Sequence, residues 1–130
     1  MDRVIGQFPQ KSKKVLTGCF EITRNSPVVD KLEQHADQLA ALGHPMRLEI
    51  VRCVVKAGRE GSPAGAIQAA LDLPASTLSF HLKRLSQAGL LSTRQEGTFL
   101  YYSADYAALR ALTEYLWQDC CKGGSKAVCC

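Results

Sequence analysis

The stretch that decides the fold is LPASTLSFHLKRLSQAGLL, from Leu73 to Leu91. Within it, Leu78, Leu82 and Leu85 recur at the three- and four-residue spacing of one helical face. Ser76 stands near the start of this pattern, where a hydroxyl can cap a helix. Further small hydroxyl side chains follow on the other faces. The stretch therefore predicts a capped amphipathic helix that buries leucines and presents short polar groups.

The neighbouring segments predict a helix-turn-helix. Residues Ala64 to Leu71 are typical of a short helix, and Asp72-Leu73-Pro74 forces a break after it. The helix that follows is expected to end at Gly89, because glycine readily takes the left-handed conformation found after a helix. A short helix, a tight turn and a second capped helix together make the motif.

The remaining segments extend this pattern on both sides. Helices are predicted from Asp30 to Leu42, from His44-Pro45 onward and from Asp105 to Cys121, and the cluster Gly58 to Pro63 predicts a turn. Two β-prone runs, Leu90–Arg94 and Phe99–Ser103, flank Gln95–Thr98 and predict a hairpin. The expected fold class is mainly α with a β-hairpin. We expect a flexible N-terminal arm (1–27), one folded domain (28–121) and a cysteine-containing tail (122–130).

Length and charge permit a nucleic-acid partner. A chain of 130 residues has room for one core. The formal net charge is +4 and the isoelectric point is about 8.8, which is compatible with DNA without requiring it. The distribution is more informative, because residues 73–94 contain three cations and no carboxylate. A phosphate backbone would meet positive charge at this segment.

The cysteines indicate soft-metal or redox chemistry. The chain has six, and the first residues lack the apolar core of a signal peptide, so we expect the cytosol and no disulfide scaffold. No apolar run approaches the length of a membrane-spanning helix. Four of the six lie close together near the end of the sequence: Cys120, Cys121, Cys129 and Cys130. Thiolates favour trivalent arsenic or antimony, copper(I), cadmium or zinc, and a redox pair is the alternative.

Three segments resemble the ArsR/SmtB family of metalloregulatory repressors. Leu39–Ile50 (LAALGHPMRLEI) is similar to the opening signature of that family, Ser76–Leu91 to its recognition helix, and Gly97–Tyr102 (GTFLYY) to its wing. The resemblance covers about residues 32–117, with the motifs in family order. It implies a winged helix-turn-helix homodimer, with the first and last helices at the subunit interface and with repression that an inducer relieves.

The resemblance also indicates where an inducer would bind. The best-known arsenic sensors of this family carry a Cys-x-Cys pair on the helix before the recognition helix, but Ser62–Ile67 holds no cysteine here. One subgroup uses a vicinal pair at the end of the last helix and a further cysteine downstream. Cys120 and Cys121 fit that pair, and Cys19, Cys129 or Cys130 could complete a three-sulfur site. The expected ligand is trivalent arsenic or antimony as inducer, with no organic cofactor.

The recognition helix supplies the expected contacts with double-stranded operator DNA. N-terminal residues of such a helix meet base edges in the major groove, which suits Ser76, Thr77 and Ser79. Lys83 and Arg84 are expected at phosphates, together with Arg94 of the wing. The alternative is that Ser76 is only a helix cap and that the cations form a solvated surface. Catalysis is not expected, because no nucleophile stands with a recognisable base and orienting partner.

Overall fold

The computed structural model describes residues 16–17, 20–21, 27–120 and 122, with side chains from Asp30 onward. The chain divides into two compact units, Met1–Gln34 and His35–Cys130. In the first unit, β1 (Leu16–Thr17) pairs antiparallel with β2 (Phe20–Glu21). Apart from these strands and residue 27, the predicted N-terminal arm lies outside the described residues.

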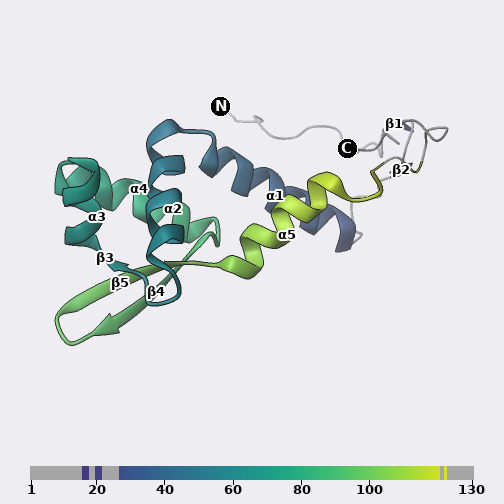
Figure 1. Ribbon diagram of the computed structural model, residues 1–130. Coiled ribbons are helices and arrows are strands. Elements are labelled where there is room, and N and C mark those ends of the chain that lie inside the picture. Colours follow the sequence, from purple (N-terminus) through teal and green to yellow (C-terminus); the bar gives the residue numbers. More distant parts are fainter. Residues whose placement is uncertain (1–15, 18–19, 22–26, 121, 123–130) are drawn as a thin grey trace, which may run out of the picture. The chain divides into compact units, whose positions relative to one another are not determined.

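The second unit has the winged helix-turn-helix order that the sequence predicts (Figure 1). Helix α1 (Pro27–Leu42) spans the boundary between the units. The elements that follow are α2 (Pro45–Ala57), β3 (Ser62–Pro63), α3 (Ala64–Leu71), α4 (Ala75–Gln87), β4 (Leu91–Glu96), β5 (Phe99–Ala104) and α5 (Tyr106–Trp117). The predicted fold class, mainly α with a β-hairpin wing, is confirmed.

One hydrophobic core holds the helix-turn-helix against the base of the wing. Its members come from α1, α2, α3, α4, the residue before β4 and the inner ends of β4 and β5: Ala41, Ile50, Val51, Val54, Ile67, Leu78, Leu82, Leu85, Leu90, Leu91 and Ala104. The leucine spacing of residues 78–85 thus marks the buried side of α4, as expected for an amphipathic helix. Burial of each large aliphatic side chain contributes about 1.5 to 3 kcal/mol, so this packing fixes the rotation of α4.

Helix α2 begins as the sequence predicts. His44 is its N-cap, and the Nδ1 atom of the imidazole accepts a hydrogen bond from the amide of Met46 at 3.2 Å. Pro45 follows at the first helical position, where its missing N–H is not needed. The guanidinium of Arg47 donates through Nε to the carbonyl of Ala41 at 2.6 Å, which ties α2 to the end of α1.

The predicted start of the first helix and the predicted end of the last helix are wrong. Helix α1 begins at Pro27, before the expected start at Asp30, since proline is well tolerated in a first helical turn. Helix α5 ends at Trp117 and does not reach Cys121. The amide of Gln118 donates to the carbonyl of Tyr115, and Asp119 has a left-handed φ of 58°, so the helical pattern stops before the cysteines.

The wing is a three-stranded antiparallel sheet of order β3-β5-β4, in which β3 is additional to the predicted hairpin. The hairpin turn is also shorter than expected. Glu96 pairs with Phe99, so Gly97 and Thr98 form a two-residue connection. Within the sequence assigned to a turn, Ser62 pairs with Tyr102 and Pro63 with Tyr101. This pairing attaches the start of α3 to the wing, a long-range contact that local turn signals do not contain.

Gly61 makes the junction between β3 and β5 close. Its φ is +76°, and a Cβ atom placed there would lie 2.5 Å from the backbone oxygen of Tyr102. Gly89 has a similar φ of +77°, but a Cβ atom there would meet nothing within 4 Å. The two positions therefore share an unfavourable φ for an L residue, and Gly61 adds a backbone clash.

We expect Gly61→Ala to lower the free energy of unfolding more than Gly89→Ala. The left-handed conformation costs an L residue about 1 to 2 kcal/mol, which is the expected loss at Gly89. The clash at Gly61 should add at least about 1 kcal/mol, because backbone must move. Urea unfolding followed by circular dichroism measures both. Equal losses in the two variants would mean that the close junction between β3 and β5 does not exist.

Candidate nucleic-acid interface

Helix α4 has one buried side and one polar side. Leu78, His81, Leu82 and Leu85 are buried. The rest of the circumference forms the solvent face of α4, defined as Ser76, Thr77, Ser79, Phe80, Lys83, Arg84 and Gln87, of which Arg84 is half-buried and the others exposed. The structure therefore brings together on one face the five residues of this helix predicted to contact DNA. Phe80, which was not among them, is also the most exposed large hydrophobic residue of the part of the chain that the structure describes, at 65%.

The start of α4 differs from the prediction. Its N-cap is Pro74, which makes no side-chain capping bond, and Ser76 lies inside the first turn. Proline holds the extended conformation that a cap needs, with φ −60° and ψ 144°. The prediction that Ser76 caps the helix is wrong, and so is the alternative that capping explains this residue. Its hydroxyl is exposed and available to a ligand.

The turn between α3 and α4 and the end of α4 are both tightly held. Asp72 adopts a left-handed conformation with φ 50°, and its amide donates to the carbonyl of Gln68. At the far end, the amide of Gly89 donates to the carbonyl of Ser86 and the amide of Leu90 donates to the carbonyl of Leu85. These are the two hydrogen bonds of a Schellman motif. These local bonds satisfy carbonyls at the helix end and direct the chain into β4. The predicted end at Gly89 is confirmed.

A groove of about 490 Å³ runs between α4 and the wing. Two residues predicted to contact DNA, Ser79 and Lys83, line its helix side, and four residues that the sequence reasoning missed complete the lining: Ser86, Gln87, Thr93 and Tyr102. Gln87 could have been found, since it lies four residues after Lys83 on the same helical face. The strand residues could not, because nothing local specifies which face of the hairpin meets α4.

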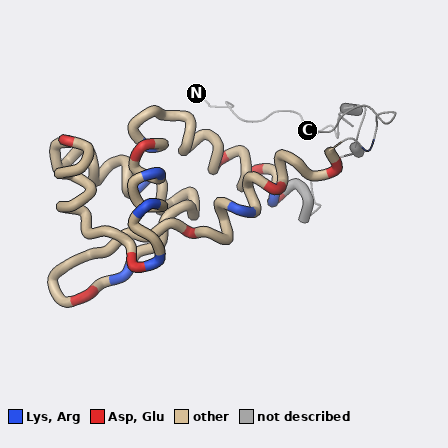
Figure 2. Tube along the Cα trace, in the orientation of Figure 1, with Lys and Arg blue, Asp and Glu red and all other residues tan. Residues whose placement is uncertain are grey.

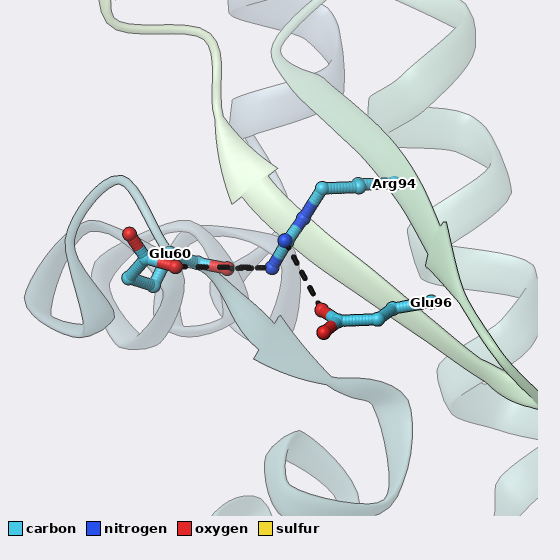
Figure 3. Close-up of polar contacts among 3 residues, drawn as sticks. All are labelled: Glu60, Arg94 and Glu96. Atoms are coloured by element: carbon cyan, nitrogen blue, oxygen red, sulfur yellow. Dashed lines mark hydrogen bonds and ion pairs between the residues drawn. The ribbon is translucent and has the colours of Figure 1, made fainter.

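Arg94 is held within the wing (Figure 3). Its Nη2 donates to the carbonyl oxygen of Glu60 at 3.1 Å, and its Nη1 pairs with the carboxylate of Glu96 at 3.1 Å. The Glu60 carboxylate lies 4.0 Å away, and the guanidinium carbon is 5.0 Å from the centre of the Tyr101 ring. This surface cluster orients Arg94 along the outer side of the sheet. A phosphate contact by Arg94 would have to compete with two carboxylates.

The charge on α4 contrasts with the wing. Lys83 is exposed and forms no ion pair with any described residue. Figure 2 marks acidic residues in red, and none of them falls within residues 73–94. An anion approaching α4 therefore meets cations and hydroxyls and no carboxylate of the helix itself. Cations beside hydroxyls on one helix face suit a polyanionic ligand that also carries hydrogen-bonding groups.

His81 links the solvent face of α4 to α2. The residue is 6% exposed, and its ring lies 5.0 Å from the ring of His44 and 5.6 Å from that of Phe80. Its Nδ1 is buried without a hydrogen-bond partner among the described residues. Desolvation by burial lowers the pKa of His81, with smaller contributions in the same direction from His44 and Arg47.

The expected sensor cysteines fall mostly outside the described residues. Cys120 is exposed and lies in a turn after α5, with its amide donating to the carbonyl of Trp117 at 3.1 Å. An Asp119–Lys122 ion pair occupies the same turn. Cys121, Cys129, Cys130 and Cys19 are outside the described residues. Within the described part of the chain, no three or more His, Cys, Asp or Glu side chains gather as metal ligands.

An exposed polar helix beside a wing defines a DNA-binding module of the winged helix-turn-helix class. The family profile described as a helix-turn-helix domain matches residues 42–94. The HTH-type transcriptional regulator YgaV of Escherichia coli strain K12 is 34% identical over 80 residues, which span 62% of this chain and 79% of YgaV. None of the helices among the described residues combines the length and apolar character of a membrane span.

Solved structures agree with this match. The homodimeric winged helix-turn-helix domain of Mb0332 from Mycobacterium bovis, a possible ArsR-family regulator, is 29% identical, with a TM-score of 0.58 over 75% of this chain and 92% of that domain. A possible transcriptional regulator for arsenical resistance is 33% identical, with a TM-score of 0.53 over 62% and 84% of the two chains. The chain belongs to the helix-turn-helix transcriptional regulators, and its DNA-binding domain is of the ArsR-like type.

We expect the free energy of unfolding to fall as the pH drops below about 6.5, the ordinary pKa of histidine. Because the folded-state pKa of His81 is lowered, the unfolded chain takes up a proton first, and stability declines from that pH downward. Urea unfolding between pH 7.5 and 5.5 measures the slope. His81→Gln should flatten it. A variant with the wild-type slope would assign the pH dependence to other groups.

Proposed function

We propose that this regulator is a homodimeric repressor that places α4 in the major groove of operator DNA and releases it when trivalent arsenic or antimony binds the C-terminal cysteines. The solvent face of α4 supports the DNA-binding part of this proposal, because it presents hydroxyls next to the wing groove and cations without an ion-pair partner among the described residues. The cysteine spacing of the sequence carries the inducer part.

The proposed contacts follow from position along α4. Ser76, Thr77 and Ser79 lie in its first turns, where side chains of a recognition helix reach base edges. Lys83 and Arg84 lie one to two turns later, and there they meet phosphates that fix the register of the helix. Arg94 is a weaker phosphate ligand in this proposal, because Glu60 and Glu96 already share its charge.

Exposed apolar side chains on α1 and α5 support a dimer. Leu39, Leu116 and Trp117 are 43%, 58% and 63% exposed. Burial of such groups against a second copy would recover free energy in proportion to the apolar area removed from water. Mb0332, a relative in sequence and fold, is itself a homodimeric DNA-binding domain. Two-fold symmetry then predicts two related half-sites about one helical turn or a multiple of it apart.

We expect Lys83→Ala to reduce the salt dependence of operator binding. Each lost phosphate contact should lower the slope of log affinity against log salt by about one unit per subunit. Fluorescence anisotropy on DNA from upstream of the gene, at several salt concentrations, gives the slope. Arg94→Ala should change it less. Lys56→Ala, at an exposed cation of α2, is the control, and an equal effect of Lys83→Ala and Lys56→Ala would contradict the proposed placement of α4.

The cysteines near the end of the chain suit an ion that binds three sulfur ligands, such as trivalent arsenic. Arsenite, As(OH)₃, exchanges three hydroxyls for three cysteine sulfurs and releases three waters, with the thiol protons carried off in the water. Cys120 is exposed at the turn after α5, so an ion could reach it. Cys121 would supply a second sulfur and Cys129, Cys130 or Cys19 a third. The likeness to a possible regulator for arsenical resistance supports this choice of ligand.

The proposed mechanism couples the turn after α5 to the DNA-binding face. Tyr106, the first residue of α5, donates through its hydroxyl to the carbonyl of Val55 in α2, at 3.2 Å. Helix α2 in turn packs against α3 and α4 in the core. A ligand at the far end of α5 weakens DNA binding only if it prefers one arrangement of these helices over the other. The coupling free energy needed is about 1 to 3 kcal/mol.

We expect arsenite to release the reduced protein from DNA at one or two equivalents per dimer, and the double variant Cys120→Ser, Cys121→Ser to keep DNA binding and lose release. The same anisotropy assay, free of other metals, measures both. Cys53→Ser, at a half-buried cysteine of α2, is the control and should respond like wild type. Release of the double variant by arsenite would reject the site, while release by peroxide without metalloid would indicate a redox sensor.

A further inference from the structure

The solvent face of α4 contains one aromatic residue among polar ones. Phe80 is 65% exposed, whereas the apolar side chains at positions 78, 82 and 85 are buried. Its neighbours one turn away on the helix are Ser76 and Thr77 on one side and Lys83 and Arg84 on the other. Phe80 therefore lies between the proposed base-reading hydroxyls and the proposed phosphate-binding cations.

The surroundings of Phe80 do not suit a protein partner. The other exposed large apolar residues of the described part of the chain belong to different elements: Leu39 to α1, Leu48 and Val55 to α2, Phe99 and Leu100 to the wing, and Tyr106, Leu116 and Trp117 to α5. No apolar neighbour on α4 extends Phe80 into a patch, and protein interfaces need such a patch at their centre. A ligand that fits this face must instead be polar and anionic, with a small apolar group at one point.

Duplex DNA has that pattern in its major groove. Base edges there carry hydrogen-bond donors and acceptors, and thymine adds a C5 methyl group. A phenyl ring cannot replace the water bound to a donor or acceptor, so contact with a polar edge costs free energy. Contact with the methyl group removes apolar area of both partners from water. Contact with the Phe80 ring thus favours thymine over the other bases at that position of the operator.

The ring also has an aromatic contact within the fold before any ligand binds. It packs edge-on against His81, with centroids 5.6 Å apart and an interplanar angle of 64°. His81 is itself fixed in the core against His44. A side chain that is already oriented loses less conformational entropy on contact, which strengthens discrimination.

We infer that Phe80 is a specificity-determining residue that contacts the C5 methyl group of one thymine in each operator half-site. The inference rests on the proposed docking of α4 in the major groove and deepens it by naming a base. The hydroxyls of α4 can read several bases, so the phenyl ring supplies a discrimination that they lack.

The test compares thymine with deoxyuridine, which differs only by the missing methyl group. Duplexes are selected from a random pool with the full-length reduced protein, and each thymine of one half-site is replaced in turn. We expect one replacement to weaken binding about three- to fourfold, the effect of one buried methyl group. Phe80→Ala should bind the thymine and deoxyuridine duplexes equally. Phe99→Ala, which removes a comparably exposed ring of the wing, should keep the wild-type ratio.

The outcomes separate this inference from the proposed function. Wild-type binding that tolerates deoxyuridine at every position would overturn the role of Phe80 and leave DNA binding by α4 in place. The same would follow if Phe80→Ala kept the methyl preference with its helical circular dichroism unchanged. Selection of no DNA sequence at all by the wild-type protein would overturn the proposed function, and the thymine contact with it.

Discussion

Burial of the leucine side of α4 is the constraint on which the rest of the structure depends. Leu78, Leu82 and Leu85 enter a core built by α2, α3 and the base of the wing. Successive residues of a helix are about 100° apart, so a shift of one residue would turn the polar side chains inward and expose leucine. The core thus selects which residues face the solvent, and through them what the regulator can bind.

Two cations predicted to contact DNA, Lys83 on α4 and Arg94 in the wing, have different surroundings. Both are cations of the predicted DNA-binding set, yet Lys83 on α4 has no ion-pair partner among the described residues, whereas Arg94 interacts with Glu60 and Glu96. Exposed ion pairs contribute little to stability, so the consequence of this cluster is mainly orientation. It connects the loop before β3 to the hairpin and leaves α4 as the more positive surface.

Local patterns predicted most elements because their causes are local. The bounds of α3 and the start of α2 at His44-Pro45 depend on neighbouring residues, and both predictions are confirmed. Ser76 was assigned as a cap because serine favours that position, but Pro74 holds the extended conformation first. The end of α5 was placed too late because its apolar spacing continues to Trp117 without an obvious breaker, and the turn at Asp119 is decided by backbone conformation.

The sequence by itself determined the fold class, the two-sided character of α4 and the presence of four cysteines near the end of the chain. These follow from residue type and spacing, which act over a few residues. Only the tertiary structure decided the pairing of β3 with β5, the groove between α4 and the wing, the partners of Arg94 and the exposure of Phe80. Each of these joins segments far apart in the chain or depends on the rotation of a packed helix, and the core sets both.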